Sequence, residues 1–301
     1  MRGLCFVFLA LCLASVQLAG AHAASVRTVT IGHGHLQIVG TLTLPAGDPA
    51  PVVLMLHGFA GARDELRTSY VEEGVFTRTA NRLAAAGYAS LRIDFRGSGD
   101  SVADLTFSQT TFESQILDAR AAIEYLKDSP LVQGNKINLL GWDQGGLVAS
   151  AVAGRTGLPN SVALWSAIVD TVDTFAEILG EKALVDGTQA EADQPVKATL
   201  PWGVEIDLNG GFFHQVERFN TAAEIASYSG PLFVAQGAKD ELVSPESAAI
   251  LIVAHDGPEK PWIYEMDHVF NVFDTDTTLE SLISATIEFL NEYNAVNLND
   301  G

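Results

Sequence analysis

Cysteine is nearly absent from this chain of 301 residues, and both of its cysteines, Cys5 and Cys12, lie close to the amino terminus. In that region a single early charge, Arg2, precedes the apolar run Leu4–Leu13 and the small-residue pattern Ala21-His22-Ala23. This pattern is typical of a secretory signal peptide over residues 1–24. We therefore expect a secreted or periplasmic protein whose mature chain has no thiol, no disulfide and no cysteine-based metal site.

Long apolar runs are also missing, because no later segment has the roughly 20 apolar residues that a membrane-spanning helix needs. The amino-terminal run is itself too short to serve as an anchor, so no membrane association is expected. About 277 residues remain after the first 24 are removed, and 48% of the whole chain is hydrophobic. Such a chain can bury one large core, which predicts a single domain over residues 25–294 and a flexible tail over 295–301.

Basic residues are scarce, with 17 Lys and Arg against 37 Asp and Glu, so the formal net charge is −20. Loss of Arg2 with the leader makes it −21. This charge argues against a nucleic acid or an anionic membrane surface as a partner, and a small neutral substrate fits it better. The acidity by itself is typical of an adaptation for solubility.

Signatures of metals and nucleotides are missing as well. The histidines at 33, 35, 214 and 255 do not recur at metal-ligand spacings with nearby carboxylates. No glycine fingerprint follows the first strand of a βαβ unit with an acidic residue beyond it. We expect neither a metal nor a cofactor.

What the chain does contain is an alternation of apolar strands and amphipathic helices that predicts a mostly parallel sheet flanked by helices. The predicted strands are a hairpin over Val26–Ile31 and Leu36–Leu44, then Val52–Leu56, Ala89–Ile93, Lys136–Leu140, Ser161–Trp165, Leu232–Gln236 and Trp262–Glu265. The predicted helices are Phe76–Ala86, Phe112–Lys127 with Thr110 and Glu113 spaced as a capping box, Gln144–Ala153, Pro245–Val253 and Thr278–Tyr293. The alternation lapses over about 170–228, which predicts an inserted cap above the carboxyl edge of the sheet.

A motif over residues 141–146 reads Gly141-Trp142-Asp143-Gln144-Gly145-Gly146. It has the glycine spacing of the nucleophile elbow, the sharp strand-to-helix turn that displays a hydrolase nucleophile. Glycines at 141 and 145 allow a strained turn and a close approach of the following helix, so the middle side chain stands clear of the sheet. That middle residue is Asp143, where a serine is expected. The motif alone is a weak signal.

Two later residues strengthen the motif, because Asp240 and His268 each follow a predicted late strand. Nucleophile, acid and base in the chain order Asp143, Asp240, His268 match the order of a hydrolase triad on a parallel sheet. The alternatives are that Asp240 belongs to a surface turn and that His268 is merely buried. Ligands of open α/β sheets bind at the carboxyl ends of the strands, which is where all three residues are predicted.

A backbone site for an oxyanion is predicted at His57-Gly58-Phe59, directly after the first buried strand. The N–H groups of Phe59 and Gln144 could together hold a negatively charged oxygen, and Gln144 begins a helix whose dipole adds to the same field. The alternative is that this segment is only a turn. The stretch Asp94–Ser101 contains serines between glycines, but it lacks the context of an elbow and is interpreted as structural, with Asp94 and Arg96 bracing the loop.

With these residues in place, the chain from about Ile38 to Asn291 resembles the cinnamoyl (feruloyl) esterase branch of the α/β-hydrolases, near the serine-aminopeptidase-like and dienelactone-hydrolase-like groups. The matching stretches are His57-Gly58-Phe59, Leu91–Ser101, the elbow, Gly237–Pro245 and Asp267–Phe270. The resemblance implies an α/β-hydrolase fold, a small-molecule ester as substrate, Asp240 as the triad acid, His268 as the base, and Phe59 and Gln144 as oxyanion donors. The family has a serine where this chain has Asp143, which puts ordinary acyl transfer in doubt.

An aspartate at 143 changes the expected chemistry. His268 would lie between two carboxylates, each favouring its protonated form, so its pKa should be raised and it should be a poor base. One interpretation is an ester hydrolase scaffold whose Asp143 form is weak or inactive. A second is a hydrolase with an aspartate nucleophile that acts on epoxides or alkyl halides. Epoxide hydrolases of this kind use tyrosines from the cap, but the interval Asp170–Ser227 contains none and Tyr228 lies at its edge. Haloalkane dehalogenases use a tryptophan directly after the nucleophile, where this chain has Gln144. A third is a binding protein that has lost turnover.

The predicted cap holds three aromatic residues, Trp202, Phe212 and Phe213, that could form a wall for a planar acyl group. The alternative is that they form the core of the cap itself.

Overall fold

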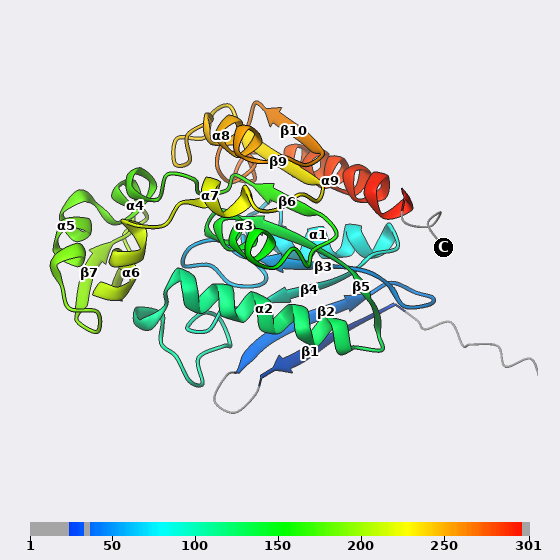
Figure 1. Cartoon of the computed structure of the whole chain (residues 1–301), viewed down its shortest axis with the longest axis horizontal. Helices are drawn as coiled ribbons and strands as arrows, with labels where there is room; N and C mark the ends of the chain where they lie inside the picture. Colours follow the sequence, from blue (N-terminus) through cyan, green and yellow to red (C-terminus); the bar gives the residue numbers. More distant parts are fainter. Residues whose placement is uncertain (1–23, 33–36, 297–301) are drawn as a thin grey trace, which may run out of the picture.

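A computed structural model of the chain describes residues 24–32 and 37–296 (Figure 1). The predicted signal peptide, except Ala24, and the last five residues lie outside this described part. The strands are β1 (Ser25–Ile31), β2 (Ile38–Leu44), β3 (Ala50–Leu56), β4 (Ala89–Ile93), β5 (Val132–Trp142), β6 (Val162–Trp165), β7 (Pro195–Thr199), β8 (Glu205–Asn209), β9 (Leu232–Gly237) and β10 (Glu259–Tyr264). The helices are α1 (Val75–Ala85), the short 3-10 helix η1 (Phe107–Gln109), α2 (Phe112–Asp128), α3 (Gln144–Thr156), α4 (Thr171–Leu179), α5 (Glu181–Gln189), α6 (Gly210–Val216), α7 (Thr221–Ile225), α8 (Ser247–Ala254) and α9 (Thr277–Val296).

A mostly parallel sheet of eight strands forms the centre of the described chain, in the order β1-β2-β4-β3-β5-β6-β9-β10. β1 pairs with β2, and β2 with β4, in antiparallel fashion, while every later neighbour is parallel. The parallel part brings the carboxyl ends of β3, β5, β9 and β10 to the same edge. This is the mostly parallel sheet that the alternation predicts, in the arrangement of the α/β-hydrolase fold that the resemblance implies.

Helices cover both faces of the sheet, with α1 and α9 on one face and α2 and α3 on the other (Figure 1). The continuous apolar run of β3 serves both layers, because Val52, Leu54 and Leu56 belong to the core under α2 and α3. Val53 and Met55 face the core under α1 and α9. Successive side chains of a strand alternate between faces, so an apolar run without alternation is typical of a strand buried on both sides.

The segment between β6 and β9 contributes no strand to the main sheet. It forms helices α4 to α7 and a separate antiparallel hairpin of β7 and β8. Most of this segment projects beyond the sheet, at the left of Figure 1, whereas α7 packs against α3. No helix in the described part of the chain has the length and apolarity that crossing a membrane requires.

Two local predictions are wrong. The capping box of α2 is formed by Thr111 and Ser114, not by Thr110 and Glu113, because Thr111 takes the extended backbone of an N-cap and its hydroxyl accepts from the Ser114 N–H at 3.1 Å. The last helix does not end at Tyr293 but runs to Val296, and the Asn294 side chain is buried, donating to the Leu290 carbonyl at 2.8 Å.

Candidate active site

The elbow at the end of β5 is formed as its glycines predict. Asp143 has φ 55° and ψ −120°, a conformation that is strained for a residue with a side chain and that costs on the order of 1–3 kcal/mol. A Cβ on Gly145 would lie 2.0 Å from the carbonyl oxygen of Leu56, and one on Gly141 would lie 2.3 Å from that of Gly145. Only glycine lets α3 pack this closely on the sheet, and the turn aims the side chain of residue 143 out of it.

The three predicted triad residues lie together at the carboxyl edge of the sheet. Asp240 follows β9, and its Oδ2 lies 3.0 Å from Nδ1 of His268, which follows β10. The other ring nitrogen, Nε2, lies 3.6 Å from Oδ1 of Asp143. His268 therefore sits between two carboxylates.

Asp240 is held as an anion. Its Oδ1 accepts from the backbone N–H groups of Leu242 at 3.0 Å and Val243 at 2.8 Å, and Oδ2 accepts from the Gln236 side chain at 3.0 Å. Burial raises the pKa of Asp240, but the hydrogen bond to His268 and these backbone donors outweigh it and bring the pKa below its usual value.

The two carboxylates dominate the protonation of His268. Burial lowers the pKa of this histidine, but its interactions with Asp143 and then Asp240 prevail and raise the pKa to about 10. The raised pKa expected from the sequence is therefore confirmed. At neutral pH the side chain is an imidazolium, which cannot accept a proton from a nucleophile.

The predicted oxyanion donor of the loop after β3 is already occupied. The Phe59 N–H donates to Oδ2 of Asp143 at 2.7 Å, so the carboxylate takes the place that a substrate oxygen would need. The other oxygen, Oδ1, is buried and has no hydrogen-bond partner among the described residues. Gln144 begins α3, and its side-chain amide donates to Gln115; first-turn N–H groups of a helix lack partners within it.

His57 positions this loop and takes no part in a triad. It is buried beside Phe95, its Nδ1 is 2.8 Å from the Gly58 carbonyl, and its Nε2 accepts from the Phe95 N–H at 3.1 Å. These partners assign the proton to Nδ1. Burial lowers the pKa of His57, so the ring stays neutral and links the loop after β3 to the loop after β4.

The stretch from Asp94 to Ser101 is structural, as predicted. Asp94 accepts from the backbone N–H of Arg63 at 2.7 Å and from that of Asp100 at 2.8 Å. Arg96 pairs with the buried carboxylate of Asp118 at 2.5 Å.

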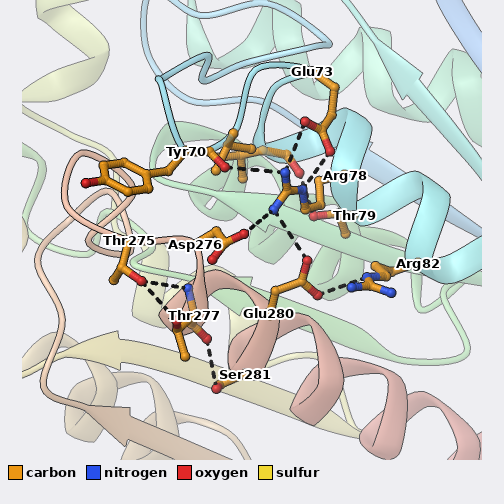
Figure 2. Close-up of polar contacts among 12 residues, drawn as sticks. Tyr70, Glu73, Arg78, Thr79, Arg82, Thr275, Asp276, Thr277, Glu280 and Ser281 are labelled. Carbon is orange, nitrogen blue, oxygen red and sulfur yellow. Dashed lines mark hydrogen bonds and ion pairs between the residues drawn. The ribbon is translucent and has the colours of Figure 1, made fainter.

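A polar cluster on α1 connects the two loops that carry Phe59 and His268 (Figure 2). Arg78 forms an ion pair with Glu73 at 2.6 Å, in the segment that leads from Phe59 into α1. It forms another with Asp276 at 2.9 Å, in the segment between His268 and α9. The Arg78 side chain is only 17% exposed, so the pairs are partly shielded from water.

The site opens into a pocket of about 740 Å³ whose lining includes Asp143, His268, Phe59, Trp202, Phe273 and Leu242. Its wall is largely apolar, which suits a small organic ligand. Among the described residues, no group of three or more His, Cys, Asp or Glu side chains is arranged to hold a metal ion.

The aromatic residues predicted for substrate binding divide into two kinds. Trp202 is 62% exposed and lines the pocket. Phe212 and Phe213 do not line it; both are fully buried, and Phe212 packs on the rings of Phe59 and Phe175. Their assignment to the pocket wall is corrected, because α6 turns them into the core beneath the pocket.

The sequence did not point to Glu65, which also lines this pocket. Its Oε1 accepts from the Gly58 N–H at 2.6 Å, next to the Phe59 N–H that Asp143 occupies. Burial, with the nearby charge of Asp143 adding to it, raises the pKa of Glu65 well above its usual value despite hydrogen bonds from Gly58 and Ala62. No motif or spacing marks this residue, since a loop brings it to the site.

The arrangement agrees with a comparison against known families, in which the model of the alpha/beta hydrolase family matches residues 53–280. The chain belongs to this family. Over 113 residues it is 27% identical to YtaP of Bacillus subtilis (strain 168), a match that covers 34% of this chain and 38% of that relative. The matched segment is thus well under half of the relative's length.

Solved structures of hydrolases share the fold over most of the chain. Est1E from Butyrivibrio proteoclasticus with bound ferulic acid matches with a TM-score of 0.68 at 19% identity, covering 89% of this chain and 99% of that one. Dienelactone hydrolase from Anabaena variabilis matches with a TM-score of 0.62 at 16% identity, covering 90% and 99%. At these identities the likeness shows the fold.

Proposed function

We propose that the protein is an exported hydrolase of the carboxylic ester type, of the feruloyl esterase kind, in which Asp143 replaces the nucleophilic serine and leaves ester hydrolysis weak or absent. The observation that carries this proposal is the alignment of residue 143 with His268 and Asp240 beside the Phe59 N–H. The mainly apolar pocket and the esterase-like neighbours, one of them with bound ferulic acid, support an ester with an aromatic acyl group. Export is proposed from the leader sequence over residues 1–24.

The same geometry explains why this chain should be a poor esterase. An aspartate that attacked an ester carbonyl would form a mixed anhydride, which is a difficult product. The Phe59 N–H, one of the two predicted oxyanion donors, is taken by Asp143, and His268 is protonated, so the oxyanion site is incomplete and no base is free. A serine at 143 would remove the charge that causes both obstacles.

The test is to compare the unmodified chain with Asp143→Ser and Asp143→Ala on short acyl and hydroxycinnamoyl esters. We expect Asp143→Ser to gain at least about 100-fold in kcat/KM over both, because a serine triad typically contributes several powers of ten. Circular dichroism and thermal unfolding verify that each variant is folded. A folded Asp143→Ser chain that hydrolyses no ester faster than the alanine variant would contradict the proposal.

A second candidate function is supported by the unequal roles of the two oxygens of Asp143. Oδ2 is held by the Phe59 N–H at 2.7 Å, whereas the buried Oδ1 has no hydrogen-bond partner and lies beside His268. A carboxylate anchored through one oxygen presents the other for attack on a saturated carbon. Once Asp143 is esterified it loses its charge, so the pKa of His268 would fall and the ring could then activate water.

Isotope labelling tests this candidate directly. After a single turnover of an epoxide or an alkyl halide in heavy-oxygen water, peptide mass spectrometry should find one heavy oxygen in the Asp143 carboxylate. An unlabelled peptide after measured turnover would exclude Asp143 as the nucleophile.

A further inference from the structure

Glu65 is a partly buried carboxyl group in the pocket that ester hydrolysis does not use. Its carboxyl and that of Asp143 meet at Gly58: the Gly58 N–H donates to Glu65 at 2.6 Å, and a Cβ on Gly58 would lie 2.8 Å from Oδ2 of Asp143. The carboxyl group also lies against Gly61, where an added Cβ would overlap Oε2 of Glu65, so glycine at 61 leaves the space that this group takes. The loop therefore holds this carboxyl group beside the residue at the nucleophile position.

The surroundings of Glu65 favour the neutral acid. The Asp143 carboxylate lies close by, and burial in a largely apolar pocket disfavours a second negative charge. A protonated carboxyl can donate a proton, and none of the tyrosines of the described chain lines this pocket. The site thus holds one carboxylate with a free oxygen, on Asp143, and one carboxylic acid, on Glu65.

We propose that Glu65 protonates the ring oxygen of an epoxide while Oδ1 of Asp143 attacks a ring carbon. This inference rests on the second candidate function and assigns it a substrate class. An epoxide needs such an acid because its leaving oxygen is a strongly basic alkoxide that remains attached to the product. A halide ion leaves without a proton, so an alkyl halide gains nothing from Glu65.

The reaction balances with water as the only co-substrate. The Oδ1–carbon bond forms as the ring C–O bond breaks, and the proton of Glu65 passes to the ring oxygen, which leaves a hydroxyalkyl ester on Asp143 and a carboxylate on Glu65. Esterification removes the charge of Asp143, so His268 releases its proton to solvent, and it regains one when the carboxylate is restored. Water then attacks Cγ of Asp143, giving one proton to the neutral His268, while the Phe59 N–H holds the charge on Oδ2. The ester bond breaks, the diol takes the proton from His268, and the second proton of water returns through the new carboxyl group of Asp143 to Glu65.

The experiment measures the first step alone, in a His268→Gln background where the alkylated chain accumulates and is counted by intact-mass spectrometry. The probes are phenyl glycidyl ether and 2-phenoxyethyl bromide, an epoxide and a bromide of similar shape. Glu65→Gln is the informative variant, because its amide still accepts from the Gly58 N–H but has no acidic proton. Glu72→Gln, an exposed acid in the same loop, is the matched control.

We expect Glu65→Gln to slow alkylation by the epoxide at least about 100-fold and alkylation by the bromide less than about threefold, since general acids typically contribute 10²–10⁴-fold. Glu72→Gln should change neither rate. Equal slowing of both probes, or no slowing of the epoxide, would overturn the role of Glu65 while the nucleophile assignment stands. Adducts with the bromide alone would also overturn it, and no adduct with either probe would overturn the aspartate-nucleophile function together with this inference.

Discussion

The charge at residue 143 should control the protonation of His268, and Asp143→Asn isolates that charge with little change of shape. Nε2 of His268 lies 3.6 Å from Oδ1 of Asp143. For two unit charges at this separation, Coulomb's law with an effective dielectric constant of about 20 gives roughly 4–5 kcal/mol, which corresponds to a change of about three in pKa. We therefore expect the pKa of His268 to fall from about 10 to about 7 in Asp143→Asn.

The assay is an NMR titration of carbon-13-labelled histidine between pH 5 and 11, with the His268 resonance assigned from a His268→Gln spectrum. The raised pKa of His268 also makes the free energy of unfolding depend on pH. Because the folded pKa of His268 is raised above its ordinary value of 6.5, its stabilising contribution is complete below pH 6.5 and is lost as pH rises toward 10. That contribution is at most on the order of 5 kcal/mol, and in Asp143→Asn it should largely vanish.

Two results would refute this reasoning. One is a His268 in the unmodified chain that titrates near 6.5, which would mean that the two carboxylates do not act on it. The other is a pKa that stays near 10 in Asp143→Asn, which would assign the effect to Asp240 alone.

Further variants test the packing and the loops around the site. Phe212→Ala should lower the free energy of unfolding by about 3–5 kcal/mol in urea titrations. Trp202→Ala should change that free energy by no more than about 0.5 kcal/mol but raise the KM of the Asp143→Ser esterase. The reverse pattern would contradict the placement of Phe212 in the core and Trp202 in the pocket. Gly145→Ala should yield little folded protein, because its Cβ would lie 2.0 Å from a backbone oxygen, and a stable variant with an intact elbow would show that contact to be absent. Arg78→Ala should lower the free energy of unfolding by about 1–2 kcal/mol and broaden the NMR resonance of His268. Lys182→Ala, which removes an exposed ion pair, should do neither. Equal effects of the two variants would argue against a role of Arg78 in linking the loops that carry Phe59 and His268.

The parallel core was predictable from the sequence because strands buried on both faces leave an unmistakable apolar run. Val52–Leu56 was recognised for this reason and forms most of β3. Ala89–Ile93, which contains Ser90 and Arg92, was predicted from the alternation of strands and helices, and it forms β4. β10 was predicted three residues late at its start, because it is an edge strand whose residues are half exposed. The hairpin of β7 and β8 was missed, since its short strands mix exposed charges with small residues.

The triad positions were predictable because parallel strands bring their carboxyl ends to one edge, so chain order translates into proximity. The bond from the Phe59 N–H to Asp143 was not, because it depends on how a loop and a strained turn approach each other. Nor was the position of Glu65, which no local pattern fixes. The burial of Phe212 depends on how the inserted segment folds back onto the sheet, and a pair of aromatic residues in sequence does not specify that.

The most direct test of a hydrolase centre at residues 143, 240 and 268 is covalent labelling of the Asp143→Ser chain by a fluorophosphonate, located by peptide mass spectrometry. We expect one adduct per chain on residue 143, and at least about 100-fold slower labelling when His268→Ala is added. A folded Asp143→Ser chain that is not labelled at residue 143, or whose labelling is indifferent to His268, would contradict the account.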